Sequence, residues 1–254
     1  MQSIFESSWL TAIYPLLLFA SVAGGYFFAR NRYYKKQRIW KPSGTENAVI
    51  GFYGLLLSFT LLSSGNANKE RNNLVHQHAD ALSAIFRESE LSNDSVKGVF
   101  RDRIKEILSL KVIGDKNIMN RDTTHDMQTD SLYNKMIKDI KMMERIQILN
   151  ADESRFYMDK IHTAIALDYR IQYSELERMP ITIMVLLIMG SLLIGILIGF
   201  TNGFNEEHHF LIPFIFLVLT SLTIITIRDL DNPTVGLIRP SYKNYENILK
   251  DMRR

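Results

Sequence analysis

Four segments of the chain are predominantly apolar and carry no Asp, Glu, Lys or Arg. They are residues 9–29, 47–68, 179–205 and 208–227. Each is about long enough to cross the hydrocarbon core of a bilayer as an α-helix, which takes roughly 17–25 residues. The pattern predicts four transmembrane helices, and the lipid bilayer is the first partner expected of the chain.

Residues 69–178 have a different pattern, because they carry 18 Lys or Arg and 19 Asp or Glu side chains and place their apolar residues at helical spacing. Stripes of this kind predict four amphipathic helices whose charged faces meet water. Breaks are expected at residues 92–95, 114–124 and 150–152. No stretch alternates for long enough to predict a strand.

The predicted fold class is all-α: a polytopic membrane protein with an aqueous helical bundle inserted between its second and third transmembrane helices. The expected segments are a first transmembrane hairpin (1–68), the aqueous block (69–178), a second hairpin (179–227) and a C-terminal tail (228–254) that carries an Asp-Leu-Asp-x-Pro motif and is basic after Pro240. Gly65 and Pro180 are weak points at the two junctions, but no turn cluster separates the block from its flanking helices. We therefore expect both flanking membrane helices to run on into the block as long helices, either straight or kinked.

Composition and motifs exclude several classes of function. A net charge of +3 dispersed over 254 residues gives no basis for nucleic-acid binding. The absence of Cys removes thiolate metal sites and Cys nucleophiles, and no phosphate-binding loop or catalytic motif is present. His76 and His78 are two positions apart, so they face different directions on one helix and belong to its polar face. We predict no enzyme activity, no cofactor and no bound metal.

The second apolar segment is more polar than a helix surrounded by lipid. Small and polar residues interrupt it throughout, at Gly51, Gly54, Ser58, Thr60, Ser63, Ser64 and Asn66. Such residues suit either close helix packing or the wall of a water-filled pore, and the two interpretations carry equal weight. These seven are the candidate pore-lining residues.

The third and fourth apolar segments carry their own periodic small or polar residues. Gly195, Gly199 and Gly203 recur at four-residue spacing, which lets another helix approach closely, and we predict a helix-packing face there. A threonine recurs every third residue from Thr220 to Thr226. Packing is favoured for these threonines, because threonines in membrane helices usually bond their own backbone.

An acidic motif follows the fourth segment. Asp229 and Asp231 stand at the end of a helix, where carboxylates oppose the helix dipole and need compensation. Pro233 and Gly236 favour a turn. The motif is either a structural link to the helical block or an ion-binding site, and the structural interpretation is favoured.

Charge does not decide which side of the membrane the block occupies. An even number of spans places both termini and the block on one side. Lys and Arg near the helix ends number six on the opposite side and seven on the side of the block. The basic loop at residues 30–41, taken alone, favours a block outside the cytoplasm.

Three passages resemble one family. Residues 51–60 (GFYGLLLSFT), residues 79–82 (ADAL) and residues 229–238 (DLDNPTVGLI) are similar to the bestrophin-like proteins of bacteria and plants. The resemblance runs from the second apolar segment onward, and the Asp-Leu-Asp-x-Pro-x-x-Gly ending is its most specific part. Residues 77–81 (QHADA) depart from the family pattern of an acidic residue followed by Ala-Asn-Ala. The acidic run that forms a calcium clasp in animal bestrophins is missing, so calcium gating is not transferred.

The resemblance implies a homo-oligomeric channel for inorganic anions, with the second transmembrane helix lining an axial pore. It also implies a bacterial inner (plasma) membrane, with the termini and the block in the cytoplasm. The alternatives are a membrane-anchored helical scaffold or sensor without a pore, and a cation-selective channel. Burial of the hydroxyl-bearing face of the second helix within one chain would favour the scaffold.

Overall fold

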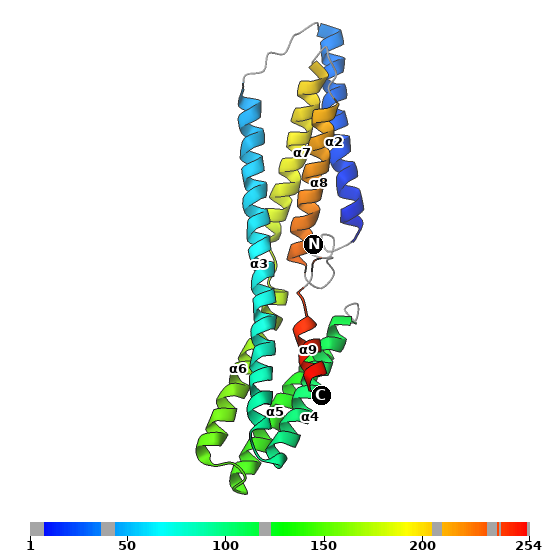
Figure 1. Cartoon of the computed structure of the whole chain (residues 1–254). Helices are drawn as coiled ribbons and strands as arrows, with labels where there is room; N and C mark the ends of the chain where they lie inside the picture. Colours follow the sequence, from blue (N-terminus) through cyan, green and yellow to red (C-terminus); the bar gives the residue numbers. More distant parts are fainter. Residues whose placement is uncertain are drawn as a thin grey trace. The chain divides into compact units, whose positions relative to one another are not determined.

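The computed structural model describes residues 8–36, 44–116, 123–204, 210–232, 238 and 240–252, and every regular element among them is an α-helix. The predicted all-α class is therefore confirmed. The helices, drawn in Figure 1, are α2 (Ser8–Lys36), α3 (Thr45–Glu90), α4 (Asp94–Lys116), α5 (Thr123–Arg145), α6 (Ala151–Leu176), α7 (Ile181–Phe204), α8 (Leu211–Asp231) and α9 (Lys243–Asp251).

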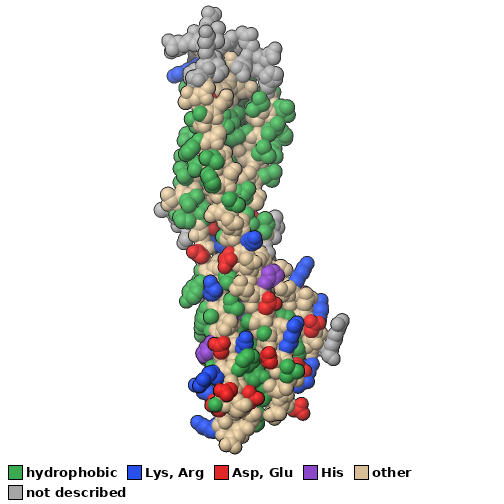
Figure 2. All heavy atoms as spheres, turned by 60° about the vertical axis from the view of Figure 1, so that its left-hand side comes forward, with side chains coloured by type: hydrophobic (Ala, Val, Ile, Leu, Met, Phe, Trp, Pro, Cys, Tyr) green, Lys and Arg blue, Asp and Glu red, His purple; other side chains and the backbone are tan. Residues whose placement is uncertain are grey.

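The chain divides into two compact units. The first, which we call the membrane unit, comprises residues 1–67 and 178–232; the second, the helical block, comprises residues 68–177 and 233–254. Four helical stretches are long and apolar enough to cross a membrane. In Figure 2 the visible surface of the membrane unit is rich in hydrophobic side chains, whereas the helical block displays charged ones. The chain is an integral membrane protein.

Two membrane helices were expected to continue into the helical block, and only one of them does so without a break. Helix α3 continues without interruption for 46 residues, as expected, and Gly65 does not break it. Helices α6 and α7 do not form one continuous helix, since residues 177–180 separate them at the predicted weak point Pro180. Glu177 already has an extended backbone, with φ −71° and ψ 112°. Pro180 supplies the reason: it has no backbone N–H to donate, and its ring disfavours a helical conformation at the preceding residue.

In the membrane unit, α2 packs backbone to backbone against α7. A Cβ atom added at Gly199 would overlap the carbonyl group of Val22, and one added at Gly203 would lie 2.7 Å from the carbonyl oxygen of Tyr26. At Gly195 an added Cβ would overlap the Ser21 side chain. A glycine of α2 takes part in the same contact, because a Cβ added at Gly25 would overlap the carbonyl oxygen of Ile196.

Side chains complete the core of the membrane unit. Its buried members come from α2, α7 and α8: Tyr14, Leu18, Met184, Leu187, Ile224 and Ile227. Apolar burial between helices gains little free energy when the surrounding solvent is itself hydrocarbon. The glycine contact is therefore what holds α2 and α7 at close range.

The helical block has a continuous core built from the predicted apolar stripes. Residues of α3, α4, α5 and α6 contribute to it, among them Leu82, Ile85, Phe100, Ile104, Ile107, Met136, Ile140, Ile161 and Ile171. The break before α6 has a clear cause, since Asn150 and Glu153 form a reciprocal cap in which each side chain accepts from the other's backbone N–H.

The C-terminal helix α9 was not predicted, because its sequence reads as a basic tail. It nevertheless packs on the block, where Tyr242, Tyr245 and the following Met252 are buried. Polar bonds hold it as well: the Tyr242 hydroxyl donates to Glu175 Oε1 at 3.0 Å, and the backbone N–H of Ser241 donates to Asn72 Oδ1 at 3.0 Å.

Two adjacent glycines of α2 test the backbone contact. We expect Gly25→Ala to destabilise the membrane unit by about 1–3 kcal/mol, because the new methyl group meets the Ile196 backbone, which cannot move aside. Gly24→Ala is the matched control, since a Cβ there meets nothing within 4 Å. It should leave the melting temperature in detergent unchanged or raise it, because alanine favours the helix. Equal melting temperatures for the two variants would contradict the contact.

Candidate functional site

The membrane-spanning part of α3 touches the rest of the membrane unit along one side. Tyr53 is buried there; its hydroxyl donates to the Leu187 carbonyl oxygen at 2.9 Å and its ring lies against Gly190 of α7. Leu57 and Leu61 follow on the same side of the helix and are half-buried. The spacing 53, 57, 61 is that of one helix face.

Most of the candidate pore-lining residues lie away from that packed side. Gly51, Gly54, Ser58, Ser63 and Asn66 are exposed within the chain. No described helix of the same chain covers them. Their small and polar side chains are thus available to water or to a second copy of the chain.

The other two candidates have different surroundings. Thr60 is half-buried, and its hydroxyl donates to the carbonyl oxygen of Leu56 at 2.8 Å. Ser64 is buried, with 4% of its surface exposed, and its hydroxyl makes no hydrogen bond to any described residue. Ser64 therefore lies on the packed side of α3, and the sequence pattern alone did not separate it from its neighbour Ser63.

The exposed face of α3 also carries large apolar side chains that an analysis based on polar residues does not single out. Phe52, Leu55, Phe59 and Leu62 are each more than half exposed. They share their part of the helix circumference with Gly51, Ser58 and Asn66. Their spacing of three and four residues is the signal that identifies them, once the packed side of α3 is known.

The acidic motif links two membrane helices to each other. The Asp231 carboxylate accepts from the backbone N–H of Met179 at 2.7 Å, just before α7 begins. Arg178 donates to the Asp231 carbonyl oxygen at 2.6 Å and to Asn232 Oδ1 at 3.0 Å. An acidic group at the end of α8 is unfavourable for that helix, but it lies beside the N-terminus of α7, where negative charge is stabilising.

The other residues of the acidic motif are Asp229, Pro233 and Gly236. Asp229 is half-buried at the end of α8, and Pro233 and Gly236 lie outside the described residues. Within the described part of the chain, no group of three or more His, Asp or Glu side chains is arranged to hold a metal ion.

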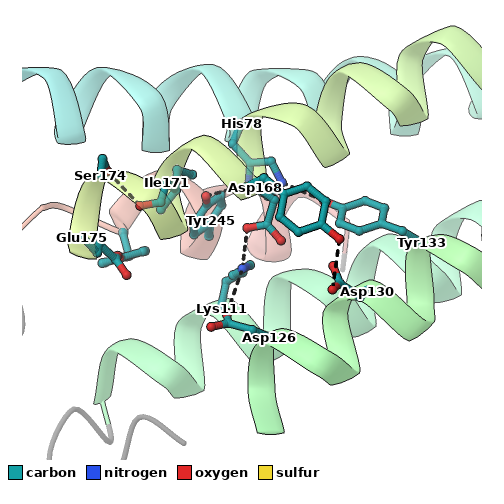
Figure 3. A network of polar contacts seen from close by, with 12 residues as sticks. His78, Lys111, Asp126, Asp130, Tyr133, Asp168, Ile171, Ser174, Glu175 and Tyr245 are labelled. Carbon is teal, nitrogen blue, oxygen red and sulfur yellow. Dashed lines mark hydrogen bonds and ion pairs between the residues drawn. The ribbon is translucent and has the colours of Figure 1, made fainter. Parts of the chain in front are cut away.

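A buried polar network lies in the helical block and was missed by the sequence analysis (Figure 3). His78 is fully buried, so the expectation that it belongs to a polar face is wrong. Its Nδ1 is 2.7 Å from the Tyr245 hydroxyl and its Nε2 is 2.7 Å from the Tyr133 hydroxyl. The imidazole therefore joins α3 to both α5 and α9.

An ion pair lies beside the histidine. Lys111 Nζ of α4 is 2.5 Å from Asp168 Oδ1 of α6, and both side chains are buried, with 8% and 2% of their surfaces exposed. Asp126 of α5 lies 4.0 Å from the same ammonium group. The signal was present in the sequence, because Lys111 and Asp168 fall at helical spacing within the apolar stripes of their helices.

These surroundings determine the charge state of His78. Burial lowers its pKa from 6.5 to about 4, the Asp168 charge opposes this decrease, and the Lys111 charge adds to it. Burial and the charge of Asp168 also raise the pKa of the Tyr133 hydroxyl well above its usual value. At neutral pH both groups are uncharged, and the network positions α9 rather than supplying a reactive group.

The fold of the chain is similar to that of solved structures. No family model and no curated protein sequence matches the chain. A bacterial bestrophin homologue from Klebsiella pneumoniae, solved by Zn-SAD phasing, is similar with a TM-score of 0.68 and 14% identity, over 93% of this chain and 97% of that one. Two single-substitution variants of a Klebsiella pneumoniae bestrophin homologue give TM-scores of 0.70 and 0.69 at 13% identity, over 94% and 96% of this chain and 97% of each of theirs.

The chain thus has the fold of bacterial bestrophin homologues over nearly its whole length. This confirms, at the level of the fold, the resemblance found in the sequence. The four-helix membrane unit and the inserted helical block are both part of the match, because the aligned region covers more than nine-tenths of each chain.

Acid is expected to destabilise the helical block through His78. Between pH 6.5 and about 4 the unfolded chain binds a proton at this residue that the folded block does not. The free energy of unfolding of the block therefore has its full value above pH 6.5. It decreases as the pH falls toward 4, by up to about 1.4 kcal/mol per pH unit. Thermal melting of the full chain in detergent across this range measures the slope.

His78→Gln is the matched control, because an amide can donate and accept hydrogen bonds but does not titrate in this range. The melting temperature of this variant should depend less steeply on pH than that of the natural chain. Identical slopes would show that His78 does not control the acid sensitivity.

Proposed function

We propose that the chain forms a homo-oligomeric ion channel, conducts anions, and lines its axial pore with the membrane-spanning part of α3. The observation that carries the proposal is the side of α3 that its own chain leaves uncovered. Four weakly polar helices cannot enclose an aqueous path alone, so several copies arranged around an axis are required. The likeness to bestrophin homologues supports the same arrangement.

The character of the uncovered face supports conduction. A helix that met only lipid would gain nothing from Ser58, Ser63 and Asn66, whereas hydroxyl and amide groups can replace part of the hydration shell of an ion. Phe59 and its apolar neighbours on the same face would form a narrow, dry constriction, a recognised way of gating a pore by dewetting.

The hydrogen-bond donors on the uncovered face of α3 support anion selectivity. Serine hydroxyl and asparagine amide groups offer hydrogen-bond donors, which stabilise a partly dehydrated anion without a fixed positive charge. Cation channels, by contrast, commonly carry rings of Asp or Glu. Residues 47–68 of this chain contain neither.

The proposed location is a bacterial inner membrane, with the helical block and both termini in the cytoplasm. The support for that side is the likeness to bestrophin-like proteins, because the charge and the Cys content of the chain do not identify the compartment. The basic loop at residues 30–41 would then face outward, against the positive-inside tendency.

Current recordings in planar bilayers test the proposal directly. With the purified full chain in asymmetric KCl, we expect a reversal potential near the chloride equilibrium potential. Asn66→Asp adds a carboxylate to the uncovered face of every copy. The ratio of chloride to potassium permeability should then fall on the order of tenfold, because a ring of like charges concentrates the counter-ion by about that factor.

Thr182→Asp is the control, since it places a carboxylate at an exposed position in the first turn of α7 rather than on α3. It should leave the permeability ratio unchanged. The absence of current at any tested pH, calcium concentration or voltage would favour a scaffold without a pore. A reversal potential near that of potassium in the natural chain would make the channel cation-selective.

A further inference from the structure

The membrane unit contains an apolar groove that the proposed pore does not use. Its volume is about 440 Å³, and its walls come from α2, α7 and α8. Phe19, Val22 and Phe27 line it from α2, and Phe214 and Leu217 line it from α8. Nearly all of the exposed surface inside is apolar, and the lining residues of α2 and most of those of α8 fall within the candidate membrane spans of these helices.

One end of the groove carries a cation. The ring of Tyr26 lines the groove, and its hydroxyl accepts a hydrogen bond from Arg30 Nη1 at 2.7 Å. The guanidinium carbon of Arg30 also lies 5.8 Å from the centre of that ring. Arg30 is the first charged residue after the apolar stretch of α2, so it stands where the helix leaves the hydrocarbon for the headgroup region.

An apolar groove that ends at an arginine matches the two parts of a phospholipid. A volume of several hundred cubic ångströms, roughly 300–1,000 Å³, accommodates a molecule of the size of a drug or a fatty acyl chain. Guanidinium groups bind phosphate oxygens through paired, charge-assisted hydrogen bonds. We propose that this groove holds one acyl chain of an anionic phospholipid, whose phosphate is bound by Arg30.

A second copy of the chain fits the groove less well. A helix is about 10–12 Å across and packs in membranes through small residues. The groove is instead lined mainly by bulky side chains, and of its two small residues, Ala23 and Gly199, the glycine has its Cβ direction blocked by the backbone of Val22. A thin, flexible acyl chain can follow such a surface, whereas a helix cannot.

Native mass spectrometry of the delipidated full chain tests the proposal. The probes are phosphatidylglycerol and phosphatidylcholine with identical acyl chains. We expect phosphatidylglycerol to bind at least fivefold more tightly than phosphatidylcholine. Arg30→Gln should abolish that preference, and Ala23→Trp, which fills the groove, should weaken the binding of both lipids by a similar factor.

Arg32→Gln is the matched control, because Arg32 lies two residues away on α2 and its guanidinium carbon is 4.9 Å from the ring of Phe28, which does not line the groove. It should retain the preference for phosphatidylglycerol within twofold. Equal binding of the two lipids by the natural chain, or an equal loss of preference in both arginine variants, would overturn the proposal. So would efficient cross-linking between copies through Ala23→Cys in lipid membranes, since it would place a second chain in the groove.

Discussion

The backbone contact between α2 and α7 is the interaction on which the membrane unit depends. Helices in lipid cannot rely on the expulsion of water, so their association requires close packing. Gly25 on one helix and Gly199 on the other allow that approach. Helix α2 occupies the glycine face of α7, and α3 packs on the membrane unit along one side, at Tyr53, Leu57 and Leu61. The rest of the membrane-spanning surface of α3 is uncovered within the chain, and it is the surface proposed to line the pore.

The helical block follows a different physical rule because its solvent is water. Apolar burial supplies its stability, and two sets of buried polar groups are paired with one another, which limits the cost of removing them from water. His78 lies between two tyrosine hydroxyl groups, and Lys111 faces Asp168. These contacts bring together helices that lie far apart in the sequence, including α9, which returns to the block after the last membrane helix.

The sequence predicted the fold well because the positions of charged residues and the spacing of apolar ones indicate whether a segment is surrounded by lipid or by water. Stretches without charge indicated the membrane helices, and stripes at helical spacing indicated the four helices of the block. The positions at which helices end were harder to predict. Pro180 ended a helix that was expected to continue, whereas Gly65 did not, because a glycine retains its backbone N–H and a proline does not. Helix α9 was missed because its nine residues carry too short an apolar pattern.

The candidate site was less predictable, because a sequence does not show which side of a helix its neighbours cover. Ser63 and Ser64 are chemically identical, yet one is exposed and the other buried. Phe52 and Phe59 were not singled out from the sequence, and they gained a place on the uncovered side of α3 only once Tyr53 defined the packed side. His78 read as surface for the same reason, since its two tyrosine partners come from α5 and α9, distant in the chain.

The proposed pore requires the uncovered side of α3 to face water in the assembled protein. Because the chain has no Cys, single cysteines can be introduced along α3 and tested in membranes with a water-soluble, membrane-impermeant thiol reagent. Ser58→Cys and Ser63→Cys should react, and Leu57→Cys, on the packed side, should not. If both serine positions react with a lipid-soluble reagent alone, then this side of α3 faces the bilayer and the chain has no pore there.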